Sequence, residues 1–304
     1  MPDPPGSMGS HGLPGVGTPP GAGGGAPTGS SRPGIPGAKT GLPDQNVLPS
    51  VRHTVAVASG KGGVGKSTVA VNLALGLSRL GYAVGLLDAD IYGPSIPMMF
   101  GLRTEQLQMK DRRLIPPEKY GLRLMSLGFL VQDDSPLIWR GPMVHGVVSQ
   151  FIKDVEWGEL DFLVIDLPPG TGDAQLTLTQ SLPLSGAVIV STPQEIALLD
   201  ARKGLKMFEK VQAPVLGFVE NMSAFIAPDT GREYPIFSKG GVARAAAELG
   251  VDLLGEIPLD LAITPSGDAG EPIVHARPES DTARRFVEIA RRVAAAVGVD
   301  APSR

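Results

Sequence analysis

Short apolar runs recur along the chain from about residue 51, without regular polar alternation. Most are rich in Val, Ile and Leu, the pattern of strands that are buried on both faces of a parallel sheet. Between them lie longer stretches in which apolar residues repeat with a helical period. We therefore expect strands at residues 53–58, 83–88, 122–127, 161–166, 187–192, 214–220 and 252–257, and helices at 67–80, 142–156, 173–181, 194–210, 240–249 and 280–297.

The alternation of strands and helices predicts an α/β fold class. We expect one domain over residues 48–299, built on a doubly wound, mostly parallel sheet with helices on both faces. Residues 91–121 hold several Gly and Pro and show no regular period, so we interpret them as an insertion over the ligand face. Within it, Met98, Met99 and Phe100 are expected to be buried rather than to form a partner surface, because Met and Phe are common core residues.

The first 50 residues differ in composition from the rest of the chain. They contain 13 Gly and 11 Pro, and their few charges cancel. Such a segment cannot bury enough apolar surface to offset the entropy lost on ordering. The segment lacks the strict Gly-X-Y period of a collagen helix. We expect residues 1–47 to form a disordered tail, with a short C-terminal tail at 300–304.

Composition and charge narrow the classes of function. The 304 residues are 42% hydrophobic, and a net charge of −4 gives no reason to expect binding to nucleic acid or to an anionic membrane. The lack of cysteine excludes disulfides, thiolate catalysis and a metal site made of cysteines. No run reaches the ~18 apolar residues of a membrane span, and no secretory signal is visible. We expect a cytoplasmic protein with neither nucleic-acid nor membrane partners.

One motif carries most of the chemical information. Residues 60–68 fit the phosphate-binding pattern G-x-x-x-x-G-K-[ST]. An expected strand precedes them and an expected helix follows, which separates this motif from an ordinary Gly-rich turn. In such a loop, successive backbone N–H groups and the helix N-terminus face a bound anion. We expect ATP to be bound by Gly60, Lys61, Gly62, Gly63, Val64, Gly65, Lys66, Ser67 and Thr68.

The motif also predicts individual roles. Lys66 would reach the β- and γ-phosphates as a catalytic cation, and Ser67 would bind Mg²⁺. In doubly wound sheets, the acidic partners of a phosphate site lie at the carboxyl ends of neighbouring strands. Asp166 ends one expected strand and is predicted to hold Mg²⁺ with Ser67. Asp90 follows another and is predicted to orient the attacking water.

Two further aspartates have roles that the sequence leaves open. Asp88 ends the strand before Asp90, and it either braces a loop, caps a helix or joins the phosphate site. Asp173 is a candidate for a supporting or switch residue, because the Gly- and Pro-rich residues 167–172 could move with the γ-phosphate. Proline could equally lock that loop.

Several runs of residues together resemble the Mrp/ApbC family of iron–sulfur cluster carrier ATPases, within the MinD/ParA/nitrogenase-iron-protein class. The extra lysine, Lys61, looks like the deviant P-loop of that class. The match runs in order from about Val47 to about Val297. The runs are residues 57–68, Asp88-Ala89-Asp90-Ile91-Tyr92-Gly93-Pro94-Ser95, Trp139-Arg140-Gly141-Pro142-Met143, Asp166-Leu167-Pro168-Pro169-Gly170-Thr171-Gly172-Asp173 and Glu220-Asn221-Met222-Ser223.

The resemblance implies a slow ATPase that forms a homodimer face to face across nucleotide. It implies that Lys61 crosses to the phosphates of the other subunit as a catalytic cation, in the manner of an arginine finger. It also implies that Asn221 recognises the adenine edge and that Pro258 packs against the base. Without the resemblance, Asn221 would be interpreted as a turn residue at a strand end. Iron–sulfur scaffold or client proteins are the implied partners.

The chain departs from the family at the position of the cluster ligands. Cluster-carrying members usually have a Cys-Pro-x-Cys motif shortly after the Asn-Met-Ser run, and here Ala227 and Thr230 occupy the two cysteine positions. Iron–sulfur clusters are held mainly by thiolates, which neither a methyl group nor a neutral hydroxyl can replace. The four histidines are scattered along the sequence and suggest no alternative ligand set. The cluster that the family implies therefore lacks its usual ligands in this chain.

Three classes of function remain open from the sequence. The resemblance favours an ATPase in iron–sulfur protein assembly. The missing cysteines favour a nucleotide-gated, dimeric binding switch for another client. The third class is a positioning ATPase like MinD or ParA, which acts on membrane or DNA, and the low overall charge argues against it.

Overall fold

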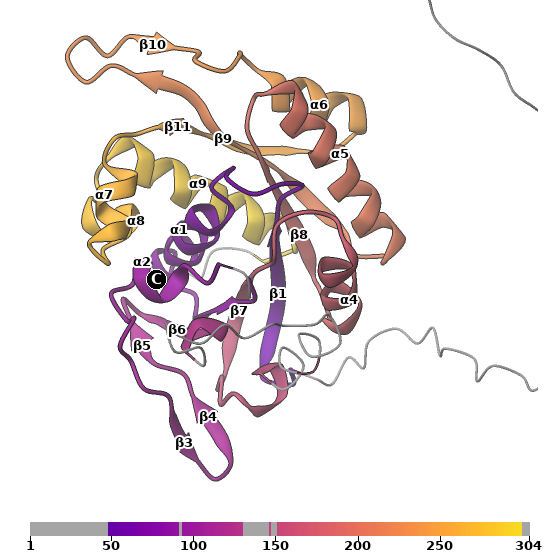
Figure 1. Ribbon diagram of the computed structural model, residues 1–304, viewed down its shortest axis with the longest axis vertical. Coiled ribbons are helices and arrows are strands. Elements are labelled where there is room, and N and C mark those ends of the chain that lie inside the picture. The colour runs from indigo at the N-terminus through magenta and orange to yellow at the C-terminus, as the bar shows by residue number, and fades with distance from the viewer. Residues whose placement is uncertain (1–47, 91–92, 130–145, 147–150, 300–304) are drawn as a thin grey trace, which may run out of the picture. The chain divides into compact units, whose positions relative to one another are not determined.

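The structure is a computed structural model that describes residues 48–90, 93–129, 146 and 151–299 (Figure 1). The tails expected at 1–47 and 300–304 lie outside the described residues, and so does the Trp139–Met143 run. Within the described part, no helix is both long enough and apolar enough to cross a membrane.

The core is a nine-stranded sheet in the order β10-β9-β8-β1-β7-β2-β6-β5, with β11 paired to β9. All the central pairings are parallel, and only the edge strands β5 and β10 pair antiparallel. This confirms the predicted mostly parallel sheet. The strands are β1 (Val51–Ala58), β2 (Val84–Asp88), β5 (Glu118–Lys119), β6 (Leu122–Ser126), β7 (Leu160–Asp166), β8 (Gly186–Ser191), β9 (Val215–Ile226), β10 (Glu233–Tyr234) and β11 (Leu253–Leu259).

Helices cover both faces of this sheet, as predicted (Figure 1). Successive side chains of a strand point to opposite faces. Accordingly, Val55 and Val57 of β1 enter one apolar core, while Ala56 and Ala58 enter the other. The first core packs under α1 (Lys66–Arg79), α8 (Ile273–Ala276) and α9 (Asp281–Ala296). The second packs under α4 (Asp173–Ser181), α5 (Glu195–Lys210) and α6 (Gly241–Leu249).

Several elements differ from the sequence prediction. Three short helices were not predicted: α2 (Ile96–Met99), α7 (Ile263–Asp268) and α8. Helices of four to six residues give too few turns for an apolar period to be visible. The hairpin of β3 (Gln108–Lys110) and β4 (Arg113–Ile115) was also missed, because its turn residues, Asp111 and Arg112, adopt φ of 50° and 67° without a glycine signal.

Two predicted boundaries were wrong. Strand β9 continues to Ile226 instead of ending at 220, so Asn221 lies inside a strand and pairs with Ile257 of β11. The helix predicted at 142–156 ends at residue 154, and the residues of it that the structure describes as helical are 146 and 151–154. Val155 forms an isolated bridge with Leu114 instead of continuing the helix.

Candidate functional site

The phosphate-binding motif lies between β1 and α1, as predicted. Gly63 and Gly65 adopt φ of 79° and 81°, the left-handed region that favours glycine. A Cβ on Gly65 would lie 2.2 Å from the amide nitrogen of Asn221, and one on Gly60 would lie 2.3 Å from the backbone of Asp200. Close packing therefore requires glycine at both of these positions.

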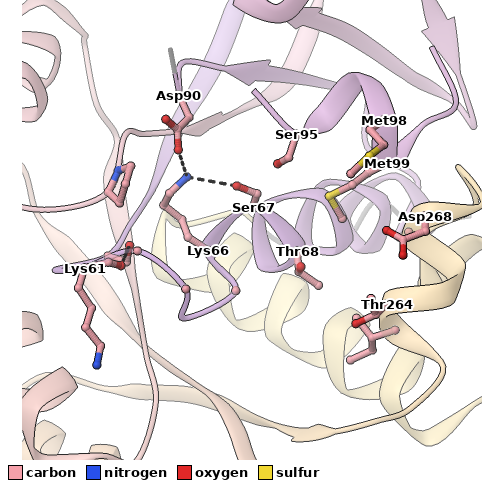
Figure 2. Close-up of a pocket in the computed structure, with 17 residues that line it drawn as sticks. Lys61, Lys66, Ser67, Thr68, Asp90, Ser95, Met98, Met99, Thr264 and Asp268 are labelled. Atoms are coloured by element: carbon pink, nitrogen blue, oxygen red, sulfur yellow. Dashed lines mark hydrogen bonds and ion pairs between the residues drawn. The ribbon is translucent and has the colours of Figure 1, made fainter. Parts of the chain in front are cut away.

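Lys66 is the buried centre of the site. Its ammonium donates to a carboxylate oxygen of Asp166 at 2.6 Å and to the hydroxyl of Ser67 at 3.3 Å. A carboxylate oxygen of Asp90 lies 3.6 Å away (Figure 2). The structure thus brings together four of the residues to which the sequence analysis assigned chemistry. In this arrangement the lysine supplies the counter-charge for two carboxylates.

The strand register explains why the carboxylates meet. Strands β2 and β7 are neighbours, and Asp88 lies directly opposite Asp166 at their carboxyl ends. Burial and, to a smaller extent, the charge of Asp166 raise the pKa of Asp88, the hydrogen bonds that its carboxylate accepts lower it, and together they place it at about 7. Burial also raises the pKa of Asp166, which the ammonium of Lys66 opposes. Proximity of buried like charges is tolerated here because a lysine and several hydrogen-bond donors face them.

The buried pair predicts a pH dependence of stability. The folded state binds a proton on Asp88 more tightly than the unfolded chain, whose pKa is near 3.8, so the free energy of unfolding should fall as the pH rises from about 4 to 7. Between pH 5 and pH 7.5 we expect wild type to lose about 1–3 kcal/mol relative to Asp88→Asn. Urea unfolding of the nucleotide-free proteins at both pH values measures this difference. Equal losses in the two proteins would contradict it.

The oxygens around Lys66 fit a hard divalent cation. Oδ1 of Asp90 and Oδ2 of Asp166 are buried and have no hydrogen-bond partner among the described residues. No three acidic or histidine side chains in that part of the chain are grouped to hold a metal by themselves. Mg²⁺ commonly uses one or two carboxylates and completes its shell with waters and substrate phosphates. The donor set is therefore suited to Mg²⁺ that arrives with a nucleotide.

A cavity of about 320 Å³ opens beside the P-loop. Figure 2 shows Lys66, Ser67 and Asp90 on one side of it, with α2 and α7 across from the loop. The segment that contains α2 lies at this cavity, as expected of an insertion over the ligand face. The expectation that Met98, Met99 and Phe100 are all buried is wrong in part, because Met98 is exposed and Met99 half-buried where they line the cavity, and only Phe100 is buried. The contribution of α7 was missed altogether. The residues that were not predicted to line the site are Ser59, Ser95, Met98, Met99, Pro169, Ile263, Thr264, Gly267 and Asp268.

Three predicted nucleotide residues lie apart from this group. Lys61 is among the residues that line the cavity, but its ammonium points away from Lys66 (Figure 2) and lies 3.4 Å from the amide oxygen of Gln194. The side-chain amide of Asn221, on β9, donates to the carbonyl of Val64 at 2.9 Å, so Asn221 supports the P-loop. Pro258 lies on β11 and lines a different cavity.

Among the aspartates whose roles were open, Asp88 has a bracing role. It accepts hydrogen bonds from two backbone N–H groups and one hydroxyl, which matches the loop-bracing alternative. Asp173 is the first residue of α4, and its side chain lies outside what the structure describes. Its predicted role as a supporting or switch residue stays a prediction.

A closed hairpin occupies the position of the family's cluster ligands. The N–H of Ala227 donates to the carbonyl of Arg232 at 3.0 Å, and the N–H of Gly231 donates to the carbonyl of Ala227 at 2.8 Å. Ala227 is buried and Thr230 is exposed. Backbone hydrogen bonds therefore hold this turn, and it presents no thiolate to a metal.

Comparison with known proteins gives consistent results. Residues 50–294 match the family model described as ParA: NUBPL iron-transfer P-loop NTPase. An iron–sulfur cluster carrier protein from Synechocystis is 52% identical over 265 residues, which cover 86% of this chain and 75% of that protein.

Solved structures agree with the fold. The nucleotide-binding protein from Archaeoglobus fulgidus in complex with ADP has a TM-score of 0.70 and 39% identity, with 81% of this chain and 97% of that chain covered. The cell division ATPase MinD from Pyrococcus furiosus has a TM-score of 0.59 and 24% identity, with 79% and 98% covered. At this identity, the similarity to MinD shows a shared fold and nothing about function.

Proposed function

The chain belongs to the ParA/NUBPL family of iron-transfer P-loop NTPases, and on this premise we propose that it binds and hydrolyses Mg-ATP in the assembly of iron–sulfur proteins. The observation that carries the proposal is the buried ammonium of Lys66, held 2.6 Å from Asp166 at the mouth of a P-loop. A relative of known structure with 39% identity binds ADP, which supports a nucleotide as the ligand.

Each residue of the site has a chemical task in this proposal. Backbone N–H groups of residues 60–68 cradle the phosphates, and Lys66 leaves the carboxylates to reach the β- and γ-phosphates. Ser67 and Asp166 would hold Mg²⁺, which when bound neutralises charge on the phosphate oxygens. Asp90 orients the attacking water and accepts its proton. The γ-phosphate then leaves as inorganic phosphate, and ADP remains.

The nucleoside would be held by residues from two strands. We propose that Asn221 recognises the adenine edge while it also supports Val64, and that Pro258 packs against the base. Asn221 is within reach of the P-loop through its 2.9 Å hydrogen bond. Pro258 follows Ile257, the residue paired with Asn221, so Asn221 and Pro258 lie at the same end of two neighbouring strands.

A homodimer across nucleotide is the proposed working form. The ammonium of Lys61 points away from the cavity of its own chain, as a residue that serves a second subunit must. In that dimer each Lys61 would approach the phosphates bound by the other chain.

Hydrolysis is the first property to test. Purified protein should release phosphate from ATP slowly, and EDTA should remove this activity because Ser67 and Asp166 cannot replace the charge of Mg²⁺. Phosphate release from labelled ATP, with and without EDTA, measures both effects. Absence of turnover in folded protein that contains Mg²⁺ would overturn the proposed ATPase function.

An iron–sulfur cluster would be cargo for this protein, and the chain has no thiolate to hold it. We therefore propose that it acts with a scaffold or client protein that supplies the cysteines. Anaerobic incubation with iron and sulfide should leave wild type without a stable cluster. The variant Ala227→Cys/Thr230→Cys, which places two thiolates on the hairpin of each chain, should bind iron and is the matched control. Stoichiometric iron and a stable cluster absorbance in wild type would show that the chain carries a cluster itself.

A further inference from the structure

Asp88 joins three separate elements beside the candidate site. It is completely buried at the end of β2. One carboxylate oxygen accepts a hydrogen bond from the backbone N–H of Asp90 at 3.1 Å. The other accepts from the N–H of Ile96 at 3.3 Å and from the hydroxyl of Ser126 at 3.0 Å. A single carboxylate thus links the loop after β2, the start of α2 and the end of β6.

Each of these links leads to a functional part of the cavity. Asp88 holds the backbone N–H of Asp90, and the carboxylate of Asp90 lies 3.6 Å from the ammonium of Lys66. Ile96 is the first residue of α2, which carries Met98 and Met99 into the cavity wall. The described cavity lining does not include Asp88 itself. Its influence on the cavity must therefore pass through the residues that it holds.

The hydrogen-bond pattern requires a carboxylate at this position. When it is ionised, the carboxylate only accepts, so in that form it can serve three donors at once. The nearly isosteric amide of asparagine would turn one acceptor into a donor that faces the N–H of Ile96. The hydroxyl of Ser126 could accept from that amide with its second lone pair, beside the bond from Gly128 at 2.9 Å, but the N–H of Ile96 would still face a donor and lose its acceptor. A buried charge is costly unless it is satisfied, so a residue with a packing role alone would be better apolar.

We propose that Asp88 is a positioning residue for ATP hydrolysis, which aims the carboxylate of Asp90 and sets the α2 wall without touching the nucleotide. The inference rests on the proposed ATPase function. It assigns Asp88 an indirect role and leaves the direct contact with water to Asp90. Misplacement of a reacting group by about 1 Å can cost about 100-fold in rate.

A double-mutant cycle between Asp88 and Asp90 tests this role. Asp88→Asn should lower the single-turnover rate of labelled ATP by about 10- to 100-fold. If Asp88 acts through Asp90, the same change made in an Asp90→Asn background should lower the remaining rate by less than about 2-fold, because coupled residues are not additive. Thermal unfolding of every variant accompanies the rates.

Asp161→Asn is the matched control. Asp161 also uses a carboxylate to brace backbone, accepting from the N–H of Ala83 at 2.9 Å, but it lies at the opposite end of β7 from Asp166. Its loss should leave the turnover rate within about 2-fold of wild type, as expected for residues far from the site. A loss as large as that of Asp88→Asn would show a general effect of structure and would overturn the inference.

The outcomes separate the two proposals. No turnover in wild type overturns the ATPase function and this inference with it. Turnover in wild type with equal losses from Asp88→Asn in both backgrounds overturns the inference alone, since Asp88 would then act independently of Asp90. If Asp88→Asn does not fold, Ser126→Ala replaces it in the cycle, because it removes one of the three bonds to Asp88. A loss of about 3- to 10-fold that disappears in the Asp90→Asn background is then expected.

Discussion

Replacing Lys66 with alanine is expected to abolish measurable ATP turnover and to weaken the binding of Mg-ATP by about 100-fold or more. In the proposed site Lys66 is the cation that the P-loop directs at the β- and γ-phosphates, and removal of one preorganised charge contact in a buried site typically costs this much. It is also buried beside Asp166 and Asp90, so its loss places two carboxylates near the phosphates without their counter-charge. Repulsion of the nucleotide then adds to the lost attraction.

Calorimetric titration with Mg-ATP and single-turnover hydrolysis measure the two effects of Lys66→Ala. Breaking a buried ion pair from one side also destabilises a fold by about 3–5 kcal/mol, so circular dichroism must show that the variant is folded at the assay temperature. Lys66→Met, which keeps the aliphatic stem, is the control for lost packing and should bind nucleotide as weakly as Lys66→Ala. A folded Lys66→Ala protein with the wild-type rate would refute the assignment of the site.

The parts of the fold that the sequence predicts well are those with a strong local signal. Five long helices and the seven principal strands follow from apolar periodicity and from alternation, and the P-loop follows from its spacing and its flanking elements. The side chains of Lys66, Ser67, Asp90 and Asp166 meet as predicted, because parallel strands bring their carboxyl ends to one edge of the sheet. Local pattern and global topology agree here, so the meeting of these side chains can be predicted from the sequence.

The rest of the site depends on contacts between distant segments. Helix α7 lines the cavity with Thr264 and Asp268, which lie about two hundred residues beyond the P-loop in a segment without apolar periodicity. The direction of a side chain is also invisible in a motif. Asp88 and Asp90 stand two residues apart in the same run, yet one braces backbone behind the cavity and the other faces Lys66. What distinguishes them is tertiary: Asp88 meets the hydroxyl of Ser126 and the N–H of Ile96, and Asp90 meets the ammonium of Lys66.

Replacing Lys61 with alanine is expected to lower ATP turnover by about 100-fold or more while the affinity for Mg-ADP stays within about 3-fold of wild type. The ammonium of Lys61 lies beside Gln194 of its own chain and points away from Lys66, so it contributes little to the nucleotide of that chain. On the proposed mechanism its charge is needed only in the dimer, where it reaches the γ-phosphate of the other subunit as negative charge is redistributed in the transition state. The effect should therefore fall on turnover and not on binding.

Mixed dimers test whether Lys61 acts across subunits. Lys61→Ala lacks the proposed crossing cation, and Asp90→Asn lacks the proposed water-orienting group, but both retain Lys66 and should bind nucleotide. In a mixed dimer the Asp90→Asn chain lends its Lys61 to the intact site of the Lys61→Ala chain. Random pairing puts half of the chains in mixed dimers with one competent site each, so an equimolar mixture should recover about a quarter of wild-type turnover from two nearly inactive proteins. Light scattering during the assay reports the dimer. If wild type keeps its full rate while it stays monomeric, or if mixing restores nothing, Lys61 does not act across subunits.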